Sequence, residues 1–581
     1  MASERLLLVL LGGLALTGCG HAEPRFPLRE PMWRDSDLQP VVVPCRAAPK
    51  PEDPRHVSCA PEPYDAPIYW DGADQMFFRP LSETLGVVVG GESRNVNSVD
   101  EVPDSAWFTN RLGARPMSLE ELRLNACKKE QLLAPEHAAD GAWIIDKGKT
   151  SGSTPGFRIN VPGKGKYLVK VEATGLPERQ VAATVIGEAV FYAAGYYASC
   201  EQALLVRPSV FKLAPGLKAT KGNFGDEYDF DQKALDAMFA KSNRRGGLLR
   251  ISASAWVPGD VLGQFQYEGT RGDDPNDVVP HQDRRELRGA RVLASWIDHF
   301  DSRQGNSLDT WLPDVKGAPP DSSPGHIVHL QIGTSAALGS AWDWDAISRR
   351  LGYSYVLDWE DMATDFGTLG AASHVWEGVQ KAPGHETFGY FNVQDFDPDR
   401  WKNEYPNPAF GRMTERDAAW MARILARFTP QHVRTMAEMG QLADPANTDY
   451  LEAVLDGRLA KILERYLTRV SPITGLRVEG ASTLCGVDLA EWRALRPAAS
   501  FRYTARRLGG GWLSVERRRG AQVCVDLPHV APDGTTADDA PSRYVRVRVE
   551  DGVARGPLVA HLYDLGPSRG YRLVGVERPD R

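Results

Sequence analysis

Three polar residues, His299, Asp301 and Asn306, follow one another at a spacing that suits phosphoryl transfer. An expected helix, 284–297, ends just before them, so they fall in a polar loop. In such a loop Asp301 would accept the proton of an attacking hydroxyl, and the amide oxygen of Asn306 would be a ligand for Mg²⁺. This interpretation requires a phosphate-binding element and a lysine elsewhere in the chain.

A loop rich in glycine, serine and threonine lies between two short β-type runs, 143–146 and 157–161. Glycines permit close backbone approach to a phosphate, and amides and hydroxyls donate hydrogen bonds to its oxygens. The alternative is a flexible hairpin tip, because glycine-rich turns are common. The residues expected to contact phosphate are Gly152, Ser153, Thr154 and Gly156.

Lys170 and Glu188 are the candidates for holding the phosphates from the other side. Lys170 lies in the middle of an expected strand, 167–171, and Glu188 lies on the apolar stripe of an expected helix, 178–195. An unpaired carboxylate on that stripe would be costly, so we expect an ion pair between Lys170 and Glu188. The alternative is an exposed strand lysine and a glutamate at the helix edge.

The arrangement of these residues resembles that of protein kinases, and this resemblance implies a second metal ligand, the Asp of a D-F-G, directly after a short apolar strand. Here the strand is 326–330, and Gln331 occupies that position in Gln331-Ile332-Gly333. A neutral amide oxygen is a weak substitute for a carboxylate toward Mg²⁺. We therefore expect metal binding at Asn306 and Gln331 to be impaired. Asp365-Phe366-Gly367 has no strand before it, and we expect a loop between helical segments there.

The glycine-rich hairpin, Lys170, Glu188 and His299-x-Asp301-x-x-x-x-Asn306 occur in an order that resembles the protein-kinase-like fold. With its long C-terminal extension, the chain looks nearer to the atypical HipA-like and CotH-like bacterial kinases. The resemblance covers about residues 105–345. It implies an ATP- and Mg²⁺-binding domain of two lobes, in which Lys170, Glu188 and Asp301 are the catalytic residues.

The N-terminus predicts export. Arg5 precedes an apolar run, 6–16, that ends in Leu16-Thr17-Gly18-Cys19, which resembles the lipobox of a bacterial lipoprotein signal. We expect cleavage before Cys19 and lipidation of that cysteine, which would anchor the protein in the membrane, with the outer membrane favoured because Gly20 follows. The alternatives are an ordinary signal peptide or a short anchor, although the run is too short to span a bilayer.

The remaining six cysteines agree with an oxidising compartment. They fall in three neighbouring pairs, which suggests the disulfides Cys45 with Cys59, Cys127 with Cys200 and Cys485 with Cys524. About fifteen connectivities remain formally open. A formal net charge of -8 over 581 residues argues against a nucleic-acid partner.

These observations predict an α+β protein. Residues 1–19 form the signal peptide, 20–104 a proline-rich tether and irregular wrap, 105–260 the N-terminal lobe, 261–475 a helical C-terminal lobe with an extension, and 476–581 an all-β, sandwich-like domain. The long apolar periodicities between 415 and 470 indicate the helices of the second lobe.

Three functions fit this sequence. The first is an envelope lipoprotein whose kinase-like domain binds nucleotide but is impaired in metal binding. The second is an active atypical kinase that phosphorylates a protein or small-molecule hydroxyl. The third is a non-catalytic scaffold whose β-domain binds an envelope protein or a glycan.

Overall fold

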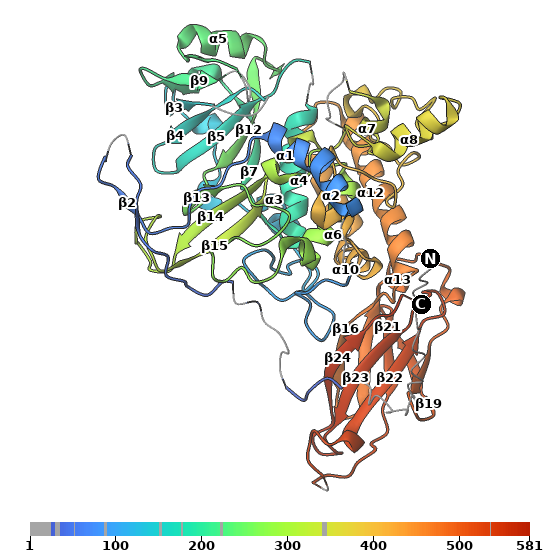
Figure 1. The fold of residues 1–581 in the computed structure, drawn as a ribbon. Helices are drawn as coiled ribbons and strands as arrows, with labels where there is room; N and C mark the ends of the chain where they lie inside the picture. The colour runs from blue at the N-terminus through green and yellow to red at the C-terminus, as the bar shows by residue number, and fades with distance from the viewer. Residues whose placement is uncertain are drawn as a thin grey trace, which may run out of the picture.

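The computed structural model describes residues 25–29, 35, 37–50, 53–85, 90–149, 154–175, 178–220, 225–339, 345–534 and 536–580 (Figure 1). Helices and sheets are mixed along the chain, which confirms the α+β class. A seven-stranded sheet lies at one end of the molecule, a β-sandwich lies at the other, and most helices lie between them. None of the helices in the described ranges has both the length and the apolar composition needed to cross a membrane.

The seven-stranded sheet follows the order β11-β12-β5-β4-β3-β8, with β7 also paired to β12. Buried aromatic and aliphatic side chains on one face of this sheet form a separate core with α5 (Gln232–Ala240). The small hairpin of β9 (Lys218–Thr220) and β10 (Glu227–Asp229) lies beside it. The strands are β3 (Trp143–Gly148), β4 (Gly156–Val161), β5 (Gly165–Val171), β7 (Glu201–Val206), β8 (Phe211–Leu213), β11 (Arg244–Arg245) and β12 (Leu248–Ala255).

Helix α4 (Arg179–Ala194) packs against this sheet on one side and against the helical region on the other, so nearly all of its residues are buried. This all-round burial explains why the helix is apolar on every face rather than amphipathic. Gly195 ends the helix with φ +129°, and Phe108 packs where a side chain would otherwise stand.

The second sheet has the order β13-β14-β15-β6, in which β6 is parallel to β15 and the other neighbours are antiparallel. Around it, α6, α10 and α12 share the largest core of the protein. The elements are β6 (Tyr197–Ala198), β13 (Asp260–Gly263), β14 (Ser307–Pro313), β15 (Gly325–Gln331), α3 (Leu119–Leu124), α6 (Arg285–Ile297), α7 (Ile347–Arg350), α8 (Trp359–Thr368), α9 (Pro408–Gly411), α10 (Glu415–Leu425), α11 (Pro430–Met439) and α12 (Pro445–Leu467).

The C-terminal region is a sandwich of two antiparallel sheets, with α13 (Leu489–Trp492) as a short helix beside it. Alternating apolar side chains of both sheets share one core. One sheet is β16 (Ile473–Glu479), β17 (Thr483–Asp488), β21 (Gln522–Asp526) and β20 (Val515–Arg518). The other is β19 (Trp512–Leu513), β18 (Thr504–Arg507), β22 (Tyr544–Glu550), β23 (Leu558–Asp564) and β24 (Tyr571–Glu577).

The sandwich is fixed to the helical region through Asp100. Its side chain accepts hydrogen bonds from Arg285 of α6 at 2.6 Å, from Arg423 of α10 at 3.2 Å and from Arg578, just after β24, at 2.6 Å. Burial acts to raise the pKa of Asp100, but the three guanidinium groups outweigh it and hold the pKa well below its ordinary value. One buried carboxylate therefore joins three distant parts of the chain.

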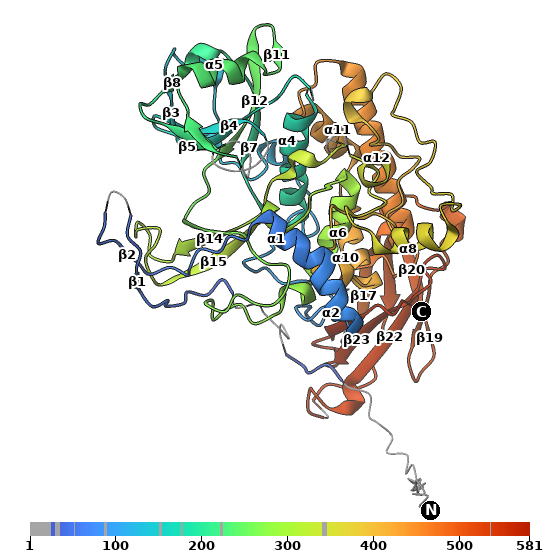
Figure 2. The same cartoon turned by 45° about the horizontal axis from the view of Figure 1, so that its top comes forward.

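The N-terminal segment contains more regular structure than the tether expected there. A short hairpin of β1 (Arg46–Ala47) and β2 (Val57–Ser58) precedes α1 (Ile68–Ala73), a π-helical turn (Asp74–Phe78) and α2 (Arg79–Leu85). The last three elements follow one another without a break, and Figure 2 shows α1 and α2 crossing the near surface as one helix. The helix was missed because its apolar residues do not face the core.

All three predicted disulfides are present in the structure, linking Cys45 to Cys59, Cys127 to Cys200 and Cys485 to Cys524. Cys19, the predicted site of lipidation, lies outside the described residues.

Candidate functional site

The predicted loop of Asp301 and Asn306 lies between α6 and β14. Asp298 ends α6 in the left-handed conformation, with φ 52°, and turns the chain toward the loop. The side-chain amide of Asn306 donates to the backbone carbonyl of Asp301 at 2.7 Å. The two residues are therefore held together by the loop itself, which the five-residue spacing makes possible.

The Asp301 carboxylate is held in its ionised form. His299 Nδ1 lies 3.2 Å from Asp301 Oδ1, and Arg303 is close by. Burial acts to raise the pKa of Asp301, but the hydrogen bond and charge of His299 and the charge of Arg303 outweigh it, so the pKa is lowered. An ionised carboxylate in a largely enclosed position can orient a hydroxyl and accept its proton.

A second carboxyl group, Glu404, lies beside the same loop and was not anticipated from the sequence. Arg303 Nε lies 2.6 Å from Glu404 Oε2. Burial raises the pKa of Glu404 to about 7, Arg303 opposes the shift, and the charge of Asp301 adds to it. No motif in the sequence marks Glu404, because it comes about a hundred residues after the loop that it contacts.

Gln331 lies at the end of β15, next to the loop in space. The backbone N–H of Ile332 donates to the carbonyl of Asn306 at 3.1 Å, which joins the two predicted metal-ligand positions. The Gln331 side chain is buried, and its Oε1 accepts the hydroxyl of Tyr267 at 3.0 Å. Its amide oxygen is therefore already engaged by a protein donor, and Tyr267 is a further residue that the sequence did not indicate.

Lys170 lies in β5, opposite Gly156 of β4 and Ser252 of β12. The expected direct ion pair between Lys170 and Glu188 is not formed. One oxygen of the buried Glu188 carboxyl group instead accepts the backbone N–H of Ser199 at 3.0 Å, and the other lies 3.4 Å from the hydroxyl oxygen of Thr334. Both oxygens therefore have polar partners, so direct contact with the lysine is not required.

The charge of Lys170 instead acts on two carboxyl groups, Glu188 and Glu201. Glu201, in β7, is fully buried beside Ser199 and Ser254, whose hydroxyls donate to it. Burial raises the pKa of both glutamates, the charge of Glu201 raises that of Glu188 further, to about 8, and Lys170 opposes both shifts. The sequence pattern missed Glu201, because only the pairing of β7 with β12 brings it to this face.

The loop between β3 and β4 is described in part. Gly152 and Ser153 lie outside the described residues, whereas Thr154 and Gly156 are within them. Gly156 pairs with Lys170 in the sheet, and a side chain there would meet the backbone carbonyl of Val169. The Thr154 hydroxyl accepts the side-chain amide of Gln180 at 2.7 Å, which ties this end of the loop to α4.

A second lysine, Lys149, lies at the same loop and near Lys170. Its Nζ donates to the backbone carbonyl of Thr154 at 2.6 Å. Burial and then the charge of Lys170 lower the pKa of Lys149 to about 7. Two lysines gathered at a partly buried position favour an anionic ligand, because such a ligand would remove their mutual repulsion. Lys149 could have been noticed from its place beside the glycine-rich loop.

The turn after β15 joins these two groups of residues. Gly333, with φ +80°, lies so close to Asn306 that a side chain there would meet the Asn306 amide. The next residue, Thr334, donates its hydroxyl to the α4 backbone carbonyl of Thr184 at 3.1 Å, and the same oxygen lies 3.4 Å from Glu188 Oε1. Gly187 permits this contact, because a Cβ at that position would stand 2.4 Å from the Thr334 Cβ.

Asp365, Phe366 and Gly367 all lie in helix α8, not in a loop. The Asp365 carboxylate forms a hydrogen bond with the His374 ring, and Phe366 is strongly exposed. The segment was expected to be a loop, and it is helical because Asp358 caps the helix through the N–H groups of Glu360 and Asp361.

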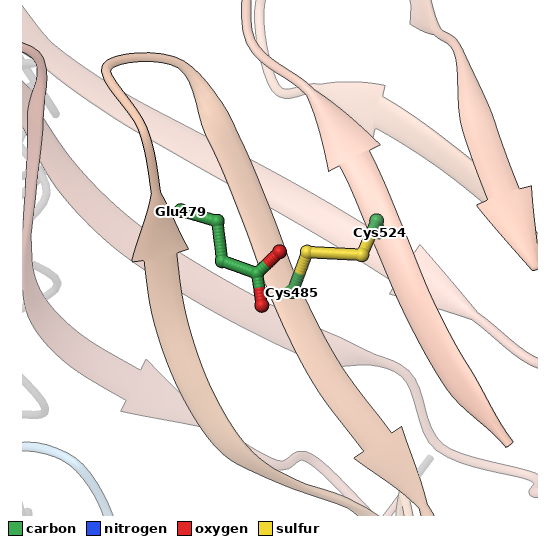
Figure 3. Close-up of side chains that lie close together, drawn as sticks. All are labelled: Glu479, Cys485 and Cys524. Atoms are coloured by element: carbon green, nitrogen blue, oxygen red, sulfur yellow. A yellow bond between two sulfur atoms is a disulfide. The ribbon is translucent and has the colours of Figure 1, made fainter. Parts of the chain in front are cut away.

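Within the described ranges, one cluster of three potential metal ligands occurs, in the β-sandwich: Glu479, Cys485 and Cys524 (Figure 3). Cys485 and Cys524 face each other on β17 and β21 and are joined in a disulfide. Neither sulfur is a thiolate, so the cluster does not offer a metal site in this state. Glu479 is instead paired with Arg477 and Arg518.

Comparison of the chain with protein-family models, with curated proteins and with solved structures finds no match.

Proposed function

We propose that this protein is an exported lipoprotein, anchored to the outer membrane through Cys19, whose N-terminal part is a two-lobed kinase-like domain that binds ATP. In this proposal the seven-stranded sheet with α4 is the first lobe, and the helical region with the loop of Asp301 is the second. Lys170 and Lys149 contact the phosphates, and the buried carboxyl groups of Glu188 and Glu201 are the acidic neighbours of Lys170.

The observation that carries the proposal is the turn from Gln331 to Thr334. It packs on Asn306 through Gly333 and on Glu188 through Thr334. A phosphotransfer site needs its lysine and its catalytic loop on two elements that face one another. The turn contacts one residue of each predicted half, Asn306 and Glu188, which are more than a hundred residues apart in the sequence, and this contact supports the proposal.

The residues present fit a nucleotide better than they fit a metal ion. Two lysines offer positive charge to phosphates. Toward Mg²⁺, Asn306 and Gln331 supply neutral amide oxygens in place of carboxylates, and the Gln331 oxygen already accepts the Tyr267 hydroxyl. We therefore propose a pseudokinase-like protein in which nucleotide binding depends little on Mg²⁺.

Thermal unfolding with ATP, with and without Mg²⁺, tests this function. We expect ATP to raise the Tm of the protein to a similar extent in EDTA and in Mg²⁺, since a ligand at 100 times its Kd stabilises by about 2.7 kcal/mol. Lys170→Met should abolish the shift. Lys166→Met changes an exposed lysine of the same strand and is the matched control. The proposal fails if no nucleotide raises the Tm, or if the two variants respond alike.

An active kinase is the second candidate, and the lowered pKa of Asp301 favours it, because an ionised base is ready to accept a proton. Incubation with labelled ATP and Mg²⁺ would then give labelled protein, and Asp301→Ala would abolish the label. Gln331→Asp, which supplies the missing carboxylate, tests the pseudokinase: nucleotide binding by this variant should become dependent on Mg²⁺. The labelling test concerns the active kinase, which would be excluded if the parent and Asp301→Ala were labelled equally.

A further inference from the structure

The helix from Ile68 to Leu85 presents its polar side to the protein and its aromatic side to solvent. Asp71 and Gln75 are buried, whereas Trp70, Phe77 and Phe78 are between 48% and 56% exposed. A surface helix of a globular protein normally has the opposite orientation, with its apolar stripe on the core. The helix therefore exposes large apolar side chains that are not part of the hydrophobic core.

The inner contacts show that polar interactions fix this orientation. Asp71 accepts the hydroxyl of Tyr405 at 2.5 Å, and Arg79 forms an ion pair with Glu268. Burial raises the pKa of Asp71, and the hydrogen bond from Tyr405 opposes that shift. The aromatic side chains are thus held outward by specific bonds on the opposite side of the helix.

Helix α8, far away in the sequence, extends the same surface. Trp359, Met362 and Phe366 lie three and four positions apart on one side of α8 and are between 48% and 85% exposed. The rings of Phe77 and Trp359 lie 6.0 Å apart, and the Trp359 indole donates to the backbone carbonyl of Met76 at 2.9 Å. The two helices therefore form one continuous apolar surface.

We propose that this apolar surface, formed by Trp70, Phe77, Phe78, Trp359, Met362 and Phe366, docks on a lipid bilayer. Contiguous exposed apolar surface marks an interaction site, and a helix with aromatic side chains on one side and polar groups on the other is suited to the membrane interface. Tryptophan and other large aromatic side chains favour that interface. The proposal does not depend on nucleotide binding.

The choice of a bilayer over a protein partner rests on the proposed lipid anchor at Cys19. Phe26 follows the predicted lipidation site, Cys19, by seven positions. Its backbone is held on the sandwich by the hydroxyls of Tyr544, at 3.1 Å, and Tyr563, at 3.0 Å. Seven extended residues reach about 24 Å, so an acyl chain on Cys19 would keep the whole protein at the membrane surface.

Charge has a limited part in this docking. The exposed groups beside the surface are acidic, as with Glu360 and Asp365, and Arg79 is paired on the inner side. Burial of the aromatic side chains, rather than attraction to anionic lipids, must therefore drive the interaction. Binding should be strongest on zwitterionic lipid and should weaken as anionic lipid is added.

Cosedimentation of residues 25–581 with phosphatidylcholine vesicles tests the proposal without the lipid anchor. This chain keeps every described residue, including the three main cores. We expect vesicle binding that falls at least tenfold in the double variant Trp70→Ser/Phe78→Ser, and that also falls in Phe366→Ser. Trp512→Ser is the matched control, because Trp512 is 73% exposed but lies on the sandwich.

Three results would overturn the proposal. They are no vesicle binding by the parent chain, equal binding by the double variant and the Trp512→Ser control, and binding that requires phosphatidylglycerol. Light scattering of the same proteins tests whether a second copy of the chain binds this surface instead. A dimer that the double variant disrupts, without vesicle binding by the parent, would assign the surface to a second copy of the chain. Circular dichroism of each variant shows that it is folded.

Discussion

Glu188 and Glu201 are two buried carboxyl groups bridged by one residue, Ser199, which donates its backbone N–H to the first and its hydroxyl to the second. Burial and the charge of Glu201 raise the pKa of Glu188 from 4.5 to about 8. At a pH between 4.5 and about 8, Glu188 is protonated in the folded protein and ionised in the unfolded chain. Glu188 therefore lowers the free energy of unfolding as pH rises, by at most about 1.4 kcal/mol per pH unit.

Replacing Glu188 by glutamine should remove this contribution. Chemical denaturation at pH 5, 6, 7 and 8 measures the free energy of unfolding of both proteins. We expect the parent to lose more stability than Glu188→Gln as pH rises from 5 to 8, with little further divergence above pH 8. Other carboxyl groups with a raised pKa, such as Glu404, contribute to the pH dependence of both proteins. The difference between the two curves therefore reports the contribution of Glu188. Parallel curves for the two proteins would refute the raised pKa.

Gly187→Ala should destabilise the protein by about 1–3 kcal/mol, because the new methyl group would stand 2.4 Å from the Thr334 Cβ and overpack the contact. It should also weaken any nucleotide-induced rise in Tm, since Thr334 connects α4 to the loop of Asn306.

Gly367→Ala is the control for that variant. Gly367 lies in helix α8, and a Cβ there meets nothing within 4 Å. The change should leave stability equal or raise it slightly, by about 0.5–1 kcal/mol, because alanine is the better helix former. Urea denaturation of both variants makes the comparison, and equal losses would argue against close packing at Gly187.

Arg578→Ala should destabilise the protein by about 1.5–3 kcal/mol, because it removes one charge-assisted hydrogen bond from the buried Asp100 and leaves it with two of its three cations. The loss should appear in the sandwich and in the helical region together, since Asp100 contacts both. Hydrogen exchange in the two regions measures this. Arg569→Ala, which removes an exposed ion pair with Asp538, should change little. A loss confined to the sandwich would contradict the joining role of Asp100.

Replacing Cys127 and Cys200 by alanine should cost about 4 kcal/mol, because this disulfide links residues 73 positions apart. The Cys45–Cys59 disulfide spans 14 positions and should cost about 3 kcal/mol. Urea denaturation of both double variants without reductant tests whether loss of the Cys127–Cys200 disulfide costs more than loss of the Cys45–Cys59 disulfide. The reverse order would show that local packing, rather than loop closure, sets the contribution of these bonds.

Local sequence patterns predicted the elements of the candidate site better than its contacts. The strand of Lys170, the helix of Glu188, the helix before Asp301 and the strand before Gln331 all form near the expected residues. Periodicity and turn residues carry that information, because both act over a few positions. The pairing of neighbouring cysteines was likewise predictable, since each pair lies within or beside one region of the fold.

Contacts between distant strands and loops were not predictable. Lys170 was expected to meet Glu188 alone, but the pairing of β7 with β12 brings in Glu201. The hydroxyl of Tyr267 reaches Gln331 from 64 positions away. The helix at Ile68 was missed for another reason, because its aromatic residues face outward and break the usual relation between apolar pattern and core.

The contact between Asp100 and Arg578 has a consequence for the order in which the protein can fold. The two residues are 478 positions apart, so Asp100 enters the growing chain long before Arg578. A chain that is synthesised from its N-terminus can build the seven-stranded sheet early, because the strands of that sheet are close in sequence. The helical region cannot reach its final stability until residue 578 arrives. Until then its partly completed state is exposed to aggregation, and chaperones are the factors suited to protect it.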